Sequence, residues 1–396
     1  MHPIVKPALR RAWRDLNTVQ FGMAPAHAMV LGPMDTATGS FLDLLDGTRG
    51  MPLLREQGRE MGLPEGHVDG LVDRLAASGL LDDATGGGPA AAALREKKAV
   101  MERMRPDLGS LSLVAPEPAG AVERLAARRA LRVQVRGAGR VGAVLASLLA
   151  GAGVGEVEVR DLGRVEPWDV APGGLPVDSV GERRESAARR AVRAAAPDRP
   201  PRSSAKGKEG EAARGLDLVV LAPRDGLAVH APDPVSAEPL ITSGTPHLYA
   251  GVVEATGVVG PLVLPGDTGC AGCLDQTRAD RDPTWPRLVA QWRSGRQRRV
   301  PPCDLALASA VAGLAASHAL AFLDGDAPSA GGVRWEASLP GCAWHAKPVL
   351  AHPGCPCGAA GKTKRERASE DEKRHATMGE QQSHAAGLAG TWRAHV

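Results

Sequence analysis

The chain has 396 residues, more than one compact domain usually holds, so two domains joined by a linker are expected. Hydrophobic residues make up 43% of the chain but aromatic residues only 3%, so its core must be built from Ala, Val and Leu. The formal net charge of +3 is too small to indicate nucleic-acid binding, and no basic stripe is interleaved with aromatic residues.

Neither a signal peptide nor a membrane span is predicted. The basic residues at the start are not followed by the apolar segment that a signal peptide needs. The longest uncharged stretch, residues 305–323, is mostly alanine and contains Ser309, Ser317 and His318, so we interpret it as a buried helix. We therefore expect a soluble cytoplasmic protein, in which clustered cysteines indicate metal binding or catalysis rather than disulfides.

Residues 1–83 predict a small α+β domain of the winged-helix type. Two short strands are expected at residues 19–23 and 27–31, and Asp35 can cap a helix that follows them. A second helix is expected at residues 51–62. A third is predicted by apolar residues at helical spacing, Val68, Leu71, Val72 and Leu75.

The segments outside the two domains carry weaker patterns. Residues 84–130 predict a glycine-rich linker followed by helices, with a candidate strand at residues 111–114. Residues 359–396 are polar and lack a repeating apolar face, which predicts a disordered tail.

A glycine-rich loop follows the first strand of the second domain. The strand, residues 131–136, leads into Gly137-Ala-Gly139-Arg140-Val-Gly142 and then a helix, and a second strand ends at Asp161. In G-x-G-x-x-G loops the glycines let backbone amides approach phosphate at a helix N-terminus. Asp161 stands where a carboxylate would accept hydrogen bonds from ribose hydroxyls. The pattern predicts a Rossmann-like nucleotide-binding fold.

Two alternatives to an ATP site remain open at this point. The glycines also serve tight packing, so the domain could have this fold and bind no nucleotide. The loop is also typical of NAD-dependent dehydrogenases, although the cysteine pattern argues against that class.

Four of the six cysteines form two close pairs. Cys270 and Cys273 make a C-x-x-C knuckle, and Cys355 and Cys357 make a C-x-C pair near the end of the second domain. Two thiolate pairs complete a tetrahedral zinc site with no open position, which indicates a structural metal. The alternative is four unligated thiols.

Four further residues are assigned no ligand or catalytic role. Cys303 precedes a helix, Cys342 and His345 lie three residues apart, and His352 stands beside the Cys355 pair. We interpret the first as a helix-start residue, the next two as a surface loop, and His352 as a turn residue or a hydrogen-bond donor near the metal.

Taken together, the motifs of residues 131–358 resemble the ThiF/MoeB/HesA family of ubiquitin-activating-type adenylyltransferases. They also resemble its actinobacterial branch, which includes leader-peptide-binding partners of peptide-modifying systems. The resemblance implies an α/β nucleotide-binding domain, usually homodimeric, that binds ATP and magnesium. It also implies attack of a C-terminal carboxylate of a peptide or small ubiquitin-like protein on the α-phosphate. The nucleotide-site residues implied are Gly137, Gly139, Arg140, Gly142, Asp161 and Arg184.

The sequence departs from the family pattern at several charged positions. Gly163 stands where a second acid is usual, the phosphate-binding Arg is missing, and the phosphate Lys corresponds to Arg184. Arg224 occupies the place of the magnesium-binding Asp, with Asp225 one residue further on.

Two functional hypotheses therefore stand. The first is an active adenylyltransferase. The second is a degenerate scaffold that binds a leader peptide through its N-terminal domain and presents it to a partner cyclodehydratase.

Overall fold

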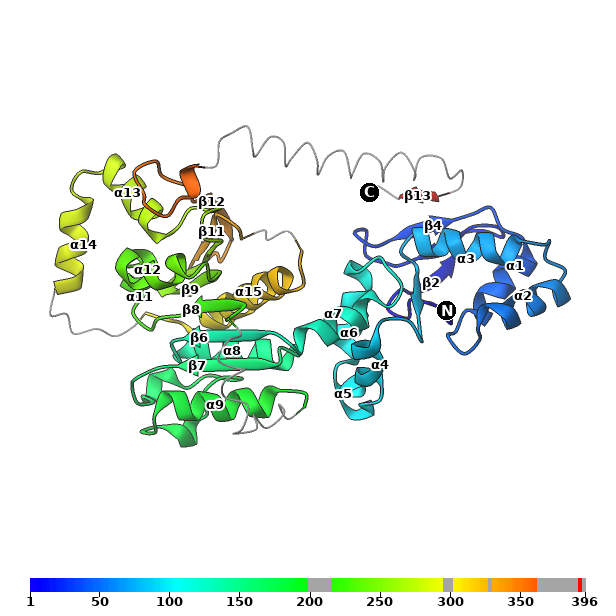
Figure 1. Cartoon of the computed structure of the whole chain (residues 1–396), viewed down its shortest axis with the longest axis horizontal. Helices are drawn as coiled ribbons and strands as arrows, with labels where there is room; N and C mark the ends of the chain where they lie inside the picture. The colour runs from blue at the N-terminus through cyan, green and yellow to red at the C-terminus, as the bar shows by residue number, and fades with distance from the viewer. Residues whose placement is uncertain (199–214, 295–301, 327–329, 362–390, 394–396) are drawn as a thin grey trace. The chain divides into compact units, whose positions relative to one another are not determined.

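The computed structural model describes the chain except for residues 199–214, 295–301, 327–329, 362–390 and 394–396 (Figure 1). It divides into two compact units. The first contains Met1–Ala127 with the C-terminal residues Glu370–Val396, and the second contains Arg128–Ser369.

The first unit contains two small sheets. One pairs β1 (Pro3–Val5) with β5 (Leu81–Asp83) in an antiparallel arrangement. The other has the order β13-β4-β3-β2 and is antiparallel throughout. Its strands are β2 (Arg11–Trp13), β3 (Val19–Phe21), β4 (Met29–Leu31) and β13 (Thr391–Arg393).

Three helices pack with these sheets around one core. They are α1 (Thr36–Phe41), which runs on into η1 (Leu42–Leu44), α2 (Met51–Glu60) and α3 (His67–Ala77). The predicted cap is confirmed, because the Asp35 carboxylate accepts a hydrogen bond from the Thr38 amide at 2.7 Å. The predicted apolar face of the third helix is fully buried. This core includes Val19, Phe21, Phe41, Leu54, Leu71 and Leu75.

Four helices follow and share a separate small core. They are α4 (Pro89–Arg95), α5 (Lys98–Arg103), α6 (Arg105–Val114) and α7 (Gly120–Arg128). The strand expected at residues 111–114 is wrong, because those residues are the last turn of α6. The buried Lys6 ammonium donates to the Ser112 and Ala115 carbonyls, and so satisfies backbone acceptors at the end of this helix.

The second unit is built on a seven-stranded mixed sheet of order β12-β11-β10-β9-β8-β6-β7. The segment β7-β6-β8-β9 is parallel, and β9 onward is antiparallel. The predicted α/β class is therefore confirmed. The strands are β6 (Arg132–Arg136), β7 (Glu156–Arg160), β8 (Leu218–Leu221), β9 (His247–Val253), β10 (Thr256–Val263), β11 (Val333–Ser338) and β12 (His345–Pro348).

Helices flank this sheet (Figure 1). The longer ones are α8 (Arg140–Gly151), α9 (Arg184–Ala195), α13 (Ala271–Arg281), α14 (Trp285–Ser294) and α15 (Leu305–Leu323). The shorter ones are α11 (Gly226–His230), α12 (Pro234–Thr242), η2 (Pro167–Asp169), η3 (Val177–Ser179) and η4 (Ala359–Gly361).

The long apolar helix α15 belongs to the core of this unit. Its length and mean hydropathy of 1.7 would suffice for a membrane span. It packs instead against α8, β9 and β10. A stripe of its residues is buried there, namely Leu307, Ala308, Val311, Ala312, Ala315, Ala316 and Ala319.

Candidate functional site

The glycine loop joins β6 to α8 in very close packing. At Gly137, where φ is +111°, an added Cβ would lie 2.0 Å from the Ala222 carbonyl oxygen at the end of β8. An added Cβ at Gly142 would lie 2.0 Å from the Gly137 carbonyl oxygen. Only glycine fits either position. The loop therefore presents the first amides of α8 at the carboxyl ends of parallel strands, where open α/β sheets bind ligands.

Asp161, which follows β7, anchors the glycine loop through hydrogen bonds. Its carboxylate accepts hydrogen bonds from the Ala138 amide at 2.8 Å, the Gly163 amide at 2.9 Å and the Arg184 guanidinium Nε at 2.9 Å. The Asp161 side chain is only 8% exposed. The predicted ribose acceptor is thus engaged within the protein, and its role toward a nucleotide stays a prediction.

Arg184 fills the space left by Gly163. A Cβ on Gly163 would lie 1.9 Å from Arg184 Nη2. The guanidinium also donates to the Arg164 carbonyl and lies 3.6 Å from the Asp169 carboxylate. The cation at the family's phosphate-lysine position is therefore held by protein groups, and its role as a phosphate ligand stays a prediction.

Arg224 lies directly against the glycine loop. Its Cγ would be 2.7 Å from a Cβ on Gly139. Its Nε donates to Asp169 at 2.7 Å, and its Nη2 donates to Glu166. Burial alone would lower the pKa of Arg224, but the two carboxylates outweigh burial and raise it. A cation thus occupies the place where the family's metal-binding acid is expected.

Glu166 and Asp169 are positioned for this role by η2. The two residues form a capping box at the start of η2. The Glu166 amide donates to the Asp169 carboxylate at 2.9 Å, and the Asp169 amide donates to the Glu166 carboxylate. Asp169 is almost fully buried between the two arginines. Three carboxylates and two guanidiniums therefore alternate along the loop: Asp161, Arg184, Asp169, Arg224 and Glu166.

A cavity of about 970 Å³ opens beside this network. Three of the predicted residues, Gly139, Arg140 and Gly142, line it, whereas Gly137, Asp161 and Arg184 do not. Asp225, which caps α11, is also in its wall. The remaining ionisable residues of the wall are Glu166, Asp169, Arg224, His230, Glu254, Cys303, Arg334 and Glu336.

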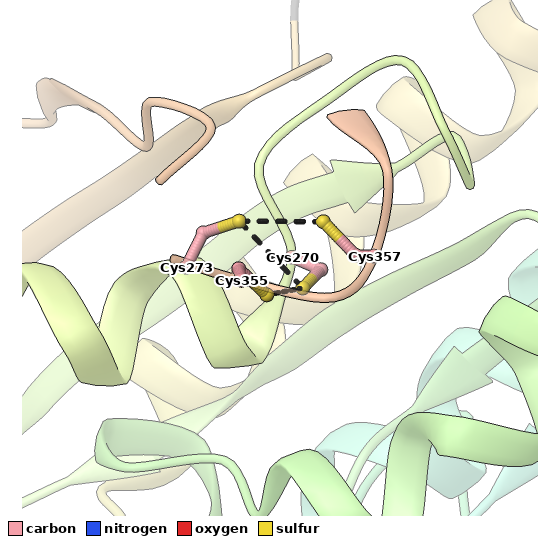
Figure 2. Close-up of side chains that lie close together, drawn as sticks. All are labelled: Cys270, Cys273, Cys355 and Cys357. Atoms are coloured by element: carbon pink, nitrogen blue, oxygen red, sulfur yellow. Dashed lines mark hydrogen bonds between the residues drawn. The ribbon is translucent and has the colours of Figure 1, made fainter. Parts of the chain in front are cut away.

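The four paired cysteines converge, as predicted, on one point (Figure 2). All four sulfurs lie within 4.8 Å of one another. Three of the separations are 3.8 Å for Cys270–Cys273, 3.6 Å for Cys270–Cys355 and 3.5 Å for Cys273–Cys357. Zinc–sulfur bonds of about 2.3 Å in a tetrahedron place sulfurs about 3.8 Å apart. The sulfur positions therefore fit a metal ion such as zinc.

The surroundings favour the thiolate at Cys273, where hydrogen bonding from the Cys270 thiol lowers the pKa to about 4. They favour the thiol at two others, because the hydrogen bond to Cys273 and burial raise the pKa of Cys270, and burial raises that of Cys355 to about 11. His352 lies beside the cluster, where its Nδ1 accepts from the Gly354 amide and its Nε2 lies 2.8 Å from Asp280. With Nδ1 accepting, Nε2 carries the proton and donates to Asp280, so His352 orders the turn and is not a fifth ligand.

The profile of the ThiF family matches residues 114–357, well over half of the chain. The chain belongs to the ThiF family. Among curated proteins, none matches the chain.

Solved structures of ThiF-type proteins share its fold. Escherichia coli MccB with ATP matches with a TM-score of 0.61 and 15% identity, over 90% of this chain and 99% of that one. MccB in complex with N-formylated MccA matches with a TM-score of 0.62, 15% identity and the same coverage. PaaA matches with a TM-score of 0.60 and 18% identity, over 87% of this chain and 99% of that one. These shares exceed the part matched by the family profile, so the likeness extends into the N-terminal unit.

The sequence did not predict the cluster formed by Arg334, Glu336 and His230 in the ThiF domain. Arg334 on β11 is 2% exposed and donates to Glu336 at 2.6 Å and to the Val229 carbonyl at 2.9 Å. Its Nη2 has no hydrogen-bond partner among the described residues. Burial and the cations Arg278 and Arg334 lower the pKa of the neighbouring His230 to about 4. Because arginines on strands are usually exposed, the sequence offers no means of finding this one.

The other cysteines take no part in the metal cluster. Cys303 lines the cavity, and its carbonyl accepts from Arg140 Nη1 at 2.8 Å. Burial raises the pKa of its thiol, so it is protonated at neutral pH. Cys342 is exposed in a loop before β12, as the sequence predicted, but His345, expected in the same loop, is the first residue of β12.

Proposed function

We propose that the ThiF domain is an ATP-dependent adenylyltransferase that activates the C-terminal carboxylate of a peptide or a small ubiquitin-like protein. The observation that carries this proposal is the cavity of about 970 Å³ with the glycine loop and the start of α8 in its wall. Its size suits a nucleotide with the end of a peptide beside it. Exposed amides and the helix dipole at this point favour phosphate.

In the proposed reaction, a carboxylate oxygen of the substrate attacks the α-phosphorus of ATP. A bond forms between that oxygen and phosphorus while the α–β phosphoanhydride breaks, and pyrophosphate leaves with the electron pair. The amides of Gly139–Gly142 would hold the phosphates, and Arg224 beside the loop would offset their negative charge. Asp225, which lines the same cavity, would hold magnesium.

A structure to which the chain is similar supports a peptide as the substrate. MccB was solved in complex with N-formylated MccA. The proposal extends to a cytoplasmic homodimer with a structural zinc at the four cysteines, and to peptide recognition by the N-terminal unit. The structure gives that unit the short strands and the apolar third helix on which this last step relies.

Pyrophosphate exchange tests the proposal. The full chain is incubated with ATP, labelled pyrophosphate and synthetic peptides encoded beside its gene, and label in ATP is measured. We expect exchange that requires a free C-terminal carboxylate, and ATP affinity no tighter than tens of micromolar as an order of magnitude. A peptide with an amidated C-terminus is the substrate control.

A matched pair of variants links the exchange to the cavity. Asp225 and Asp233 each cap a short helix, but only Asp225 lines the cavity. Because asparagine caps helices as well as aspartate does, both Asp→Asn variants should fold. We expect Asp225→Asn to reduce exchange at least 100-fold and Asp233→Asn to leave it unchanged. Equal activity of the two would exclude the metal role of Asp225.

A second candidate function is a non-catalytic scaffold that presents a peptide to a partner modifying enzyme. The observation in its favour is Arg224, which binds both Glu166 and Asp169 where a metal-binding acid is expected. A chain that binds peptides with micromolar affinity and yields no exchange with any of them would support the scaffold against the enzyme.

A further inference from the structure

The outer edge of the N-terminal sheet carries a strand from the far end of the chain. In Figure 1, β13 lies beside β4. The two pair antiparallel, with Thr391 opposite Leu31, Trp392 opposite Val30 and Arg393 opposite Met29. The sequence predicted a disordered tail over residues 359–396. Residues 391–393 of this tail form β13 and occupy the edge, whereas residues 362–390 and 394–396 lie outside the described part.

Without β13, the edge strands of this sheet would be β2 and β4, and the two differ in the charge that protects an edge against strand addition. β2 carries charge, with Arg11 in an ion pair to Asp43 at 2.5 Å and Arg10 and Arg14 on either side of the strand. Charged residues are a common protection against further pairing. β4 consists of Met29, Val30 and Leu31 and has no charged side chain. Its outward backbone groups can therefore accept another strand.

We propose that the β4 edge is a strand-accepting surface and that the chain's own segment Thr391–Arg393 is its resident occupant. The segment closes the edge in the free protein, as a tethered competitor of any external peptide. The kind of external partner that fits is an extended peptide running antiparallel to β4, because backbone hydrogen bonds carry such pairing.

Two features determine which peptides could displace β13 from the β4 edge. Met29, which pairs with Arg393, also lines a cavity of about 410 Å³ together with residues 25–28, Leu80 and Leu113. The edge thus adjoins a recess that can select side chains. Attachment to the same chain also gives the occupant an effective concentration that can reach the millimolar range. A peptide pairing over only three residues would lose to it at micromolar concentration.

Amide hydrogen exchange of the full chain tests the contact directly. A chain ending at Gly390 is compared with the full chain, and exchange is followed in the peptic fragment that contains Met29–Leu31. We expect exchange there to be at least tenfold faster after truncation, because amides facing β13 lose their acceptors. The β1–β5 pair should not change and serves as the internal control. Equal exchange of the β4 fragment in the two chains would overturn the proposal.

Two full-length variants separate pairing from side-chain effects. Replacing Thr391, Trp392 and Arg393 together by proline removes the donors of β13, while replacing all three by alanine keeps them. The proline variant should exchange like the truncated chain, and the alanine variant should retain at least part of the protection. The same rapid exchange in both variants would show that the backbone pairing is not what holds the segment.

A synthetic peptide tests whether the edge accepts a strand added from outside. The probe is the sequence of residues 386–396, added at up to 1 mM to the chain ending at Gly390. Restored protection of Met29–Leu31 is expected, and its absence would overturn the proposal. None of these measurements requires ATP, so their outcome is independent of whether the ThiF domain catalyses adenylation.

Discussion

The acids and arginines around the glycine loop pair with one another in ion pairs. The guanidinium fork of Arg184 contacts Asp161 through Nε and Nη2, and the Arg164 carbonyl and Asp169 through Nη1, whereas a lysine would have to make all of these contacts from a single nitrogen. An acid at position 163 would collide with that fork, and Gly163 leaves room for it. The two departures from the family pattern at these positions therefore explain each other.

The pairing of Asp161 with Arg184 predicts a large effect on stability. Asp161→Asn leaves a mostly buried guanidinium with one carboxylate fewer and weakens the anchor of the glycine loop. Removing one partner of a buried ion pair costs about 3–5 kcal/mol, and the remaining contact to Asp169 places this case at the lower end. Urea unfolding of the ThiF domain in the full chain measures the change in the free energy of unfolding.

A double-mutant cycle provides the control. Because Arg184→Met removes the charge left behind, the double variant should be less destabilised than the sum of the two single variants. A coupling free energy below about 0.5 kcal/mol would show that the two side chains act independently, contrary to their 2.8 Å contact.

His230 predicts a pH dependence. Burial, with Arg278 and Arg334 nearby, lowers its pKa to about 4 from the model-peptide value of about 6.5. Between these values the unfolded chain binds the proton and the folded chain does not, so stability rises with pH. Its contribution is complete above pH 6.5 and is lost as the pH falls toward 4. Urea midpoints at pH 7 and pH 5 should differ less in His230→Gln than in the unchanged protein, and an unchanged difference would assign the effect to other groups.

At the scale of elements, the four cysteines join α13 to the turn after β12, two segments about eighty residues apart in the sequence. Metal binding would therefore close a long loop and stabilise the fold. We expect about one zinc per chain. Cys273→Ser should reduce the metal content, measured by inductively coupled plasma mass spectrometry, and lower the melting temperature, measured by thermal unfolding.

The matched control is Cys342→Ser, because Cys342 is exposed and takes no part in the cluster. It should leave both metal content and melting temperature unchanged. A metal-free protein as stable as the purified one would contradict a structural zinc.

Elements were predictable from sequence where a local pattern coincided with burial. The glycine loop, the capped helix after Asp35 and the apolar face of α3 all follow from short-range rules. Residues 111–114 alternate like a strand, but they continue a helix that begins at Arg105 with Pro106 in its first turn. The three-residue strands β1, β2 and β5 are too short for any periodicity to appear, and long-range pairing alone defines them.

The site was predictable as a set of residues but not as a set of contacts. The loop glycines and the cysteine pairs have fixed spacing, so the sequence places them directly. That Arg224 replaces an acid was visible, but its partners Glu166 and Asp169 lie more than fifty residues away and only the fold brings them together. Arg334 became apparent only from its burial.

At the scale of the whole molecule, the two units have separate hydrophobic cores. The first holds the cluster around Phe41 and Leu71 and the helical cluster of α4–α7. The second holds the large cluster between the sheet and α8 and α15, and the smaller one beside the cysteines. The proposed functions divide in the same way, with peptide recognition in the first unit and nucleotide chemistry in the second.

This division predicts two thermal transitions that respond to different changes. Leu71 is fully buried in the first unit, and Leu71→Ala should destabilise that unit by about 2–5 kcal/mol. For a domain of this size each kcal/mol corresponds to several degrees in melting temperature. Scanning calorimetry should show one transition lowered by Leu71→Ala and the other lowered by a zinc chelator. ATP with magnesium should raise only the chelator-sensitive transition, because ligands stabilise the unit that binds them. A single transition lowered equally by the substitution and by the chelator would mean that the units unfold together, and would remove this physical basis for assigning them separate roles.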